Sequence, residues 1–259
     1  MNPKEIIDNV MNITQKEVNK YSYPVFISDL KKKPDLIATA VIIENKQKYY
    51  LVTASHVLLS VLSCKSNFII GVNGKYINIE GEFTYSSNVE VDHFDIAYIQ
   101  LSYKFIESNS ICILDESKLL IKSRNLVPNI SFVHGFPNSM NKQSKALRKT
   151  TSFEVKAYAY GGVIKPDFLH WKECGKTKDV HTSMSYGKKS DHNMPKHPRG
   201  ISGGGLWIVP DYSDPSNFFL DSIFIEYHEK YGITFSTKIS QVVNFIDETS
   251  GFQPTVKVV

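Results

Sequence analysis

The chain contains 259 residues, with 30 Lys and Arg against 26 Asp and Glu, and 42% of its residues are hydrophobic. This composition excludes a disordered chain, and the length suits one large domain or two small ones. A formal net charge of +4 gives no general case for nucleic-acid binding. No run of about 18 apolar residues occurs and the charged N-terminal segment does not resemble a secretory signal, so we expect no membrane association. Three widely spaced cysteines (Cys64, Cys112 and Cys174) predict no disulfide framework and favour a reducing, cytoplasmic setting.

The chain begins with helical periodicity and then changes to short strands. Apolar residues at helical spacing predict an amphipathic helix over residues 4–18. Beyond it, short runs rich in Val, Ile, Tyr and Phe alternate with turn residues, and Asn73-Gly74 is a strong hairpin signal. The predicted strands span 24–28, 36–43, 48–53, 68–72, 75–81, 94–101, 129–135, 152–160, 205–209, 221–227 and 232–236. Many short strands with few helices indicate a mainly all-β protein built from barrels or a sandwich.

Three further segments complete the organisation. Residues 116–128 are predicted to connect two β-rich halves, and residues 238–248 return to helical spacing. Residues 161–200 are rich in glycine, proline and histidine, and we expect a long irregular stretch there. This stretch leads directly into the most informative motif of the chain.

That motif is HPRGISGGGLW, residues 197–207. So many glycines would weaken a simple strand, but they suit a tight turn in which backbone N–H groups approach a ligand. If Ser202 is a nucleophile, the N–H groups of Gly200 and Ser202 could form an oxyanion hole. A serine hydroxyl needs a neighbouring base, and His56 in YYLVTASHVLL is the best candidate. Asp95, at the start of an apolar strand, could orient the imidazole of His56.

The three segments together resemble the trypsin-like (chymotrypsin-fold) serine peptidases, particularly a bacterial intracellular branch. The family patterns T-A-x-H-V, D-I-A-x-x-x-L and G-x-S-G-G appear at residues 53–57, 95–101 and 200–204, in the family's order of His, Asp and Ser. The resemblance covers about residues 24–248. It implies two packed antiparallel β-barrels with an N-terminal and a C-terminal helix, and a serine endopeptidase with a His56–Asp95–Ser202 triad acting on a protein or peptide. It implies no cofactor and no metal.

The implied domain organisation follows the same family pattern. The expected units are an N-terminal amphipathic helix (1–21), a first barrel with His56 and Asp95 (22–115), a connector (116–128), a second barrel with Ser202 (129–236), and a C-terminal helix and tail (237–259).

Two positions near the serine bear on activation and specificity. Ile201 stands where zymogen-activated relatives have an aspartate, so we expect activity without proteolytic activation. Gly205 replaces a proline common in the family, a change that leaves the chemistry intact. The resemblance places the substrate pocket near five residues: Lys196, His197, Ile225, Glu226 and Tyr227. Because no carboxylate lies around Lys196, trypsin-like cleavage after Lys or Arg is not expected.

Other interpretations remain open at this point. A trypsin-fold binding or scaffold module that has lost catalysis is the main alternative, and an esterase would share the nucleophile. Four residues, Cys174, His181, His192 and His197, lie close in sequence without an organised metal-ligand spacing. The basic run over residues 142–149 lacks interleaved aromatics and favours a solvated loop over a nucleic-acid site. We expect structural roles for His93 and His134. A regulatory protein partner is a further open alternative, although no residue of the sequence indicates one.

Overall fold

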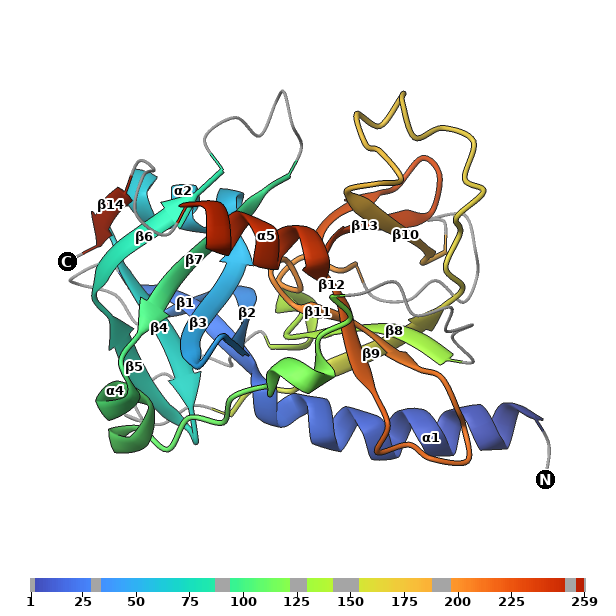
Figure 1. The fold of residues 1–259 in the computed structure, drawn as a ribbon, viewed down its shortest axis with the longest axis horizontal. Coiled ribbons are helices and arrows are strands. Elements are labelled where there is room, and N and C mark those ends of the chain that lie inside the picture. The colour runs from blue at the N-terminus through green and yellow to red at the C-terminus, as the bar shows by residue number, and fades with distance from the viewer. Residues whose placement is uncertain are drawn as a thin grey trace.

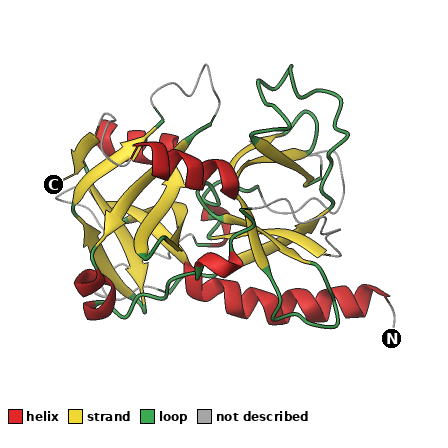
Figure 2. Cartoon of the chain, viewed as in Figure 1, coloured by secondary structure: helices red, strands yellow, loops and turns green. Residues whose placement is uncertain are grey.

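The computed structural model describes residues 3–28, 34–86, 94–121, 130–141, 154–187, 197–249 and 255–258. Within these ranges the protein consists of two curled antiparallel β-sheets that lie side by side, with helices at their margins (Figures 1 and 2). This mainly β architecture of two curled half-barrels confirms the expected fold class and is consistent with the trypsin-like fold. None of the helices in these ranges has the length and apolar character needed to cross a membrane.

The first sheet has eight strands in the order β14-β6-β7-β3-β2-β1-β4-β5. Its strands are β1 (Ser22–Ser28), β2 (Asp35–Asn45), β3 (Lys48–Ala54), β4 (Asn67–Val72), β5 (Lys75–Ile79), β6 (Gly81–Tyr85), β7 (Ile96–Leu101) and β14 (Thr255–Val258). The predicted hairpin turn between β4 and β5 is present, with positive φ at Asn73 (50°) and Gly74 (77°) as a type I′ turn requires. The short helices α2 (Ser55–Ser63) and α4 (Tyr103–Ser108) follow β3 and β7.

The second sheet has six strands in the order β10-β13-β12-β11-β8-β9. They are β8 (Ile130–Gly135), β9 (Tyr158–Gly162), β10 (His181–Ser185), β11 (Gly205–Val209), β12 (Phe219–His228) and β13 (Ile233–Lys238). The N-terminal helix α1 (Pro3–Val18) runs beneath β8 and β9, and the C-terminal helix α5 (Ile239–Thr249) packs on β12 and β13 (Figure 1). Buried residues of both helices, including Val10, Val18 and Val242, join the main apolar core.

Several local predictions are wrong in detail. The segment 154–157 is not a strand, because β9 begins only at Tyr158. The stretch 161–200 is not irregular throughout: β10 lies within it, although its sequence HTSMS lacks the apolar β-branched residues that mark a strand. Pairing with β13 buries these polar side chains and stabilises the strand. The sequence analysis also missed β6, β14 and α4.

Candidate active site

His56 is placed by the junction between β3 and α2. It is the second residue of α2, and the preceding Ser55 anchors this junction to the start of β7. The Ser55 hydroxyl donates to the carbonyl oxygen of Ile96 over 2.7 Å, and the Ser55 N–H donates to the carbonyl oxygen of Asp95 over 3.1 Å. The first turn of the helix is therefore fixed against the residue that faces the imidazole.

Asp95 holds His56 through both carboxylate oxygens. Oδ1 accepts the His56 backbone N–H over 2.9 Å, and Oδ2 lies 2.6 Å from His56 Nδ1. Asp95 has φ 51°, a left-handed conformation that aspartate tolerates better than most residues. Its side chain is 9% exposed, whereas that of His56 is 43% exposed. An ionised carboxylate only accepts hydrogen bonds, so the proton of neutral His56 resides on Nδ1 and Nε2 keeps its lone pair.

The backbone around Ser202 is fixed by its carbonyl groups. Each carbonyl oxygen from residue 199 to residue 202 accepts a hydrogen bond. The Arg199 carbonyl accepts from the N–H of Asn138 (2.8 Å), and the Ile201 carbonyl accepts from the N–H of Gly204 (2.7 Å). Thr39 supplies the other two bonds, from its hydroxyl to the Gly200 carbonyl (2.8 Å) and from its N–H to the Ser202 carbonyl (2.9 Å). Four successive peptide planes are thereby held in place. Thr39 belongs to β2 of the first barrel, so two of the four contacts cross between the barrels.

The N–H groups of the same segment divide into two classes. Ile201 donates to the carbonyl oxygen of Pro198 over 2.9 Å, and Gly203 donates to that of Phe224 over 2.8 Å. Within the described residues, no protein group accepts a hydrogen bond from the N–H of Gly200 or Ser202. The N–H and C=O of a trans peptide point in opposite directions, so the bonded carbonyls of Arg199 and Ile201 also fix these two N–H groups. Oriented, unbonded N–H groups are what an oxyanion hole requires.

A close approach between the barrels brings the serine loop to the histidine segment. Gly203 has φ 83°, and a Cβ atom there would lie 2.1 Å from the carbonyl oxygen of Thr39 and 2.2 Å from the Thr53 hydroxyl. Only glycine fits this position, and Thr53 lies three residues before His56. Among the described hydrogen bonds none joins the half-buried Ser202 side chain to His56. Such contacts often form only when substrate is bound.

The residues expected to form the substrate pocket do not all line one cleft. Lys196 lies outside the described residues. The His197 ring meets the Tyr227 ring edge to face at 5.7 Å, and the Tyr227 hydroxyl donates to the carbonyl oxygen of Gly187 over 2.8 Å. Ile225 is buried in the main core rather than open to a cleft.

Glu226 does not offer a free negative charge to a substrate. Its carboxylate lies 2.9 Å from the ammonium group of Lys176, whose side chain is only 3% exposed. Sequence reasoning missed Lys176, because a lysine in a polar segment gives no sign that its side chain is buried. Sequence reasoning also missed Thr39 and Asn138, which anchor carbonyl groups of the serine loop from outside it.

The remaining candidates do not gather into a second site. His170 pairs with Glu173 at 2.8 Å, whereas His181 contacts the backbone of Thr177. Cys174 is buried, and burial raises the pKa of its thiol, which makes it a poorer nucleophile. In the part of the chain that the structure describes, no three His, Cys, Asp or Glu side chains are grouped as a metal would require. His93, His192 and the basic run 142–149 lie outside that part.

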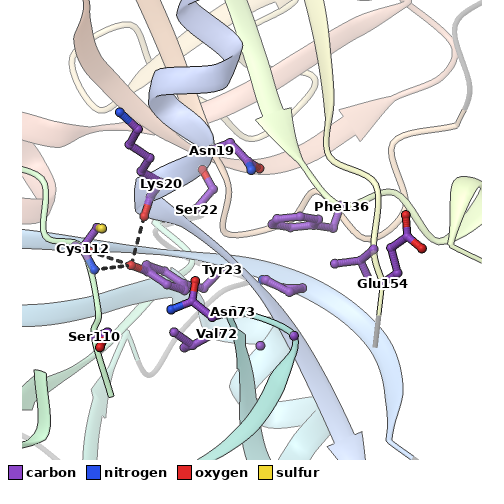
Figure 3. Close-up of a pocket in the computed structure, with 14 residues that line it drawn as sticks. Asn19, Lys20, Ser22, Tyr23, Val72, Asn73, Ser110, Cys112, Phe136 and Glu154 are labelled. Atoms are coloured by element: carbon purple, nitrogen blue, oxygen red, sulfur yellow. Dashed lines mark hydrogen bonds between the residues drawn. The ribbon is translucent and has the colours of Figure 1, made fainter. Parts of the chain in front are cut away.

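A pocket of about 390 Å³ lies at another place on the barrel junction (Figure 3). Residues of both barrels line it, and none of the three triad candidates does. On one side the Tyr23 hydroxyl bonds to the backbone of Cys112, and Phe136 lies on another side. The Phe136 N–H donates to the Thr39 hydroxyl over 3.1 Å, so this pocket borders the support of the serine loop.

The comparisons with known proteins support the fold of this chain and do not show an activity. No protein-family model and no curated protein matches the sequence. A solved structure described as "Aromatic interactions drive the coupled folding and binding of the intrinsically disordered Sesbania mosaic virus VPg protein" is 13% identical over 88% of this chain and 90% of that chain, with a TM-score of 0.53. A second, "Structure of Glu endopeptidase in complex with MPD", is 13% identical over 86% and 88%, with a TM-score of 0.48. A TM-score below 0.5 supports no conclusion, and the first likeness shows a shared fold without showing an activity.

Proposed function

We propose that the chain is a serine endopeptidase that hydrolyses peptide bonds through an acyl-enzyme on Ser202. The observation that carries this proposal is the pair of N–H groups of Gly200 and Ser202, from which no described part of the chain accepts a hydrogen bond, on the loop that bears the nucleophile candidate. The bidentate contact of Asp95 with His56 supports it, because this contact leaves Nε2 free to act as a base.

In the proposed acylation step, His56 Nε2 removes the proton from the Ser202 hydroxyl as Ser202 Oγ attacks the scissile carbonyl carbon. The carbonyl oxygen becomes an oxyanion and accepts hydrogen bonds from the N–H groups of Gly200 and Ser202. Asp95 stabilises the imidazolium that forms. The C–N bond then breaks, and His56 passes its proton to the leaving amine.

Deacylation repeats these steps with water. His56 Nε2 takes a proton from a water molecule whose oxygen attacks the acyl carbon, and the same N–H groups hold the second oxyanion. The bond between the acyl carbon and Ser202 Oγ then breaks. His56 returns the proton to Ser202, which restores the enzyme and releases a carboxylic acid.

The proposal includes activity without zymogen cleavage. In zymogen-type relatives the residue before the serine is an aspartate that pairs with a newly formed amine, whereas Ile201 is fully buried among apolar residues such as Val133 and Leu206. Burial of an isoleucine side chain stabilises the loop by roughly 1.5–3 kcal/mol without any counter-charge. The three free cysteines agree with a reducing compartment, and we extend the proposal to a cytoplasmic enzyme that acts on proteins or peptides.

The test uses the intact chain, with its mass confirmed, and a fluorophosphonate probe. We expect stoichiometric labelling that peptide mapping assigns to Ser202, and cleavage of a peptide library by the same preparation. Ser202→Ala should lose both properties, with peptide hydrolysis reduced by about 10⁴- to 10⁶-fold. Ser213→Ala, at an exposed serine of the turn before β12, is the matched control and should behave as the wild type.

The alternative outcomes separate the competing functions. Labelling that appears only after cleavage near residues 20–35 would contradict the preformed site. Labelling with turnover of small esters but not of peptides would indicate an esterase. A folded chain that neither labels nor cleaves would overturn the proposal and favour a binding module with this fold.

A further inference from the structure

Thr39 lies at the centre of the contact between the barrels. It is a fully buried residue of β2, and three of its polar groups form hydrogen bonds. Its N–H donates to the Ser202 carbonyl oxygen over 2.9 Å, and its own carbonyl oxygen accepts the Thr53 hydroxyl over 2.9 Å. The Thr39 hydroxyl adds contacts to Gly200 and Phe136 of the second barrel. One residue thus joins the strand that leads to His56 and the loop that carries Ser202.

The direction of the hydroxyl contacts is unambiguous. A backbone N–H can only donate, so the Phe136 N–H donates to Thr39 Oγ1 over 3.1 Å. The single hydroxyl proton therefore goes to the Gly200 carbonyl oxygen over 2.8 Å. Both the donor and an acceptor capacity of this buried hydroxyl are satisfied, so its orientation is fixed from two sides.

This contact restrains one side of a peptide plane whose other side is held by the Ile201 N–H, which donates to the carbonyl oxygen of Pro198 over 2.9 Å. The Gly200 carbonyl belongs to the plane between residues 200 and 201, which lies between the two planes that carry the unbonded N–H groups. Gly200 has φ 100° and no Cβ atom to resist rotation of its backbone. Rotation of the central plane would turn the N–H of Ser202 and the N–H of Gly200 relative to one another. Two hydrogen bonds oppose that rotation: the one from the Ile201 N–H to Pro198 within the loop, and the one from the Thr39 hydroxyl of the first barrel.

We infer that the Thr39 hydroxyl is a positioning group for the oxyanion loop, an inference that rests on the proposed peptidase function. The first barrel then supplies, besides His56 and Asp95, the side chain that orients the N–H groups contributed by the second barrel. Thr39 does not touch the substrate. Its effect passes through the Gly200 carbonyl group.

The test compares Thr39→Val, which keeps the shape and removes the hydroxyl, with Thr39→Ser, which keeps the hydroxyl. Turnover is measured per active site titrated with the fluorophosphonate probe. We expect Thr39→Val to lower kcat by about 10- to 100-fold with KM changed by less than about 2-fold, because the loss concerns the transition state. Thr39→Ser should restore kcat to within about 3-fold of the wild type, since the same hydrogen bond can form.

A second readout does not depend on catalysis. Amide hydrogen exchange at Ile201 and Gly203 reports whether the loop is held, because both N–H groups are bonded only while the loop keeps its conformation. We expect exchange at both positions to be about 10-fold faster or more in Thr39→Val and unchanged in Thr39→Ser. Thr14→Val is the matched control. Thr14 lies in α1, is also fully buried, and its hydroxyl donates to the carbonyl oxygen of Pro215 over 3.1 Å.

The outcomes are distinguishable. Wild-type kcat and wild-type exchange in Thr39→Val, or the same changes in Thr14→Val, would overturn the inference. A wild type that neither labels nor cleaves would mean failure of the proposed function and of the catalytic part of the inference, while exchange would still show whether the hydroxyl holds the loop. If Thr39→Val does not fold, Thr39→Ala takes its place in the comparison with Thr39→Ser, because it also removes the hydroxyl that bonds the Gly200 carbonyl oxygen.

Discussion

His134 makes the stability of this protein sensitive to acid. It lies in β8, completely buried, and burial lowers the pKa of its imidazole from 6.5 to about 3. The Ser22 hydroxyl donates to the Val18 carbonyl oxygen over 3.2 Å, so across the 3.0 Å contact with Ser22 it accepts the proton of His134 Nδ1. His134 Nε2 then carries a lone pair that no described group bonds. The folded protein holds this histidine neutral.

The sign and size of the effect follow from the two pKa values. The unfolded chain binds a proton at His134 as the pH falls below about 6.5, whereas the folded chain does not until about pH 3. The free energy of unfolding therefore falls as the pH is lowered through this interval. At pH 4.5 the unfolded histidine is about 99% protonated, which corresponds to a loss of about 3 kcal/mol in the free energy of unfolding relative to pH values above 7.

The assay is urea unfolding at pH 7.5 and at pH 4.5, on the wild type and on His134→Phe. The variant keeps an aromatic ring and cannot bind the proton, so the wild type should lose about 3 kcal/mol more than the variant between the two pH values. His170→Phe, at a histidine whose side chain is 41% exposed, controls for removal of a histidine elsewhere. Parallel losses in the wild type and in His134→Phe would refute the reasoning.

Three further predictions concern the site itself. Asp95→Asn should lower kcat for peptide hydrolysis by about 10⁴-fold through the wrong imidazole tautomer, and a steady-state assay showing near-normal kcat would contradict this. Gly203→Ala should destabilise the fold by about 2–5 kcal/mol in urea unfolding, because its Cβ atom would lie 2.1 Å from the Thr39 carbonyl oxygen; wild-type stability would exclude the close approach. Cleavage profiling should yield few products that end in Lys or Arg, since Glu226 is paired with Lys176 at 2.9 Å; a profile dominated by such products would be the contrary result.

The sequence was sufficient for the features that leave a local signal. The apolar run ending at Thr53 and the apolar run beginning at Ile96 predict strands, and polar residues at their ends then stand out as candidates. The glycines around Ser202 stand out for a related reason, because such a run has no value in a regular strand. The hydrogen bonds between His56 and Asp95 agree with the pairing that the motifs predict.

Features made by distant contacts left no such signal. Thr39 is an ordinary β-branched residue of an apolar strand, and its role arises from Gly200, which lies 161 residues away. The strand β14 pairs with β6, and its four residues are too short a segment to predict a strand from the sequence. Lys176 is buried, and its ammonium group pairs with Glu226 of β12, 50 residues further along the chain. Each of these depends on partners that periodicity and local composition do not identify.

The distribution of contacts suggests where control of such a site would act. His56 and Asp95 are hydrogen-bonded to each other within the first barrel, and the second barrel contacts the residue before Asp95, because the Thr237 hydroxyl of β13 donates to the carbonyl oxygen of Phe94 over 2.6 Å. The serine loop depends on the other barrel more directly, because two of its four carbonyl contacts come from Thr39 across the barrel junction. A perturbation that separates the barrels slightly would release those two contacts, and it would also strain the Thr237 contact beside Asp95. The orientation of the oxyanion loop therefore depends on how the two barrels pack against each other, and a loosened junction would lower turnover because the N–H groups of that loop would lose their alignment.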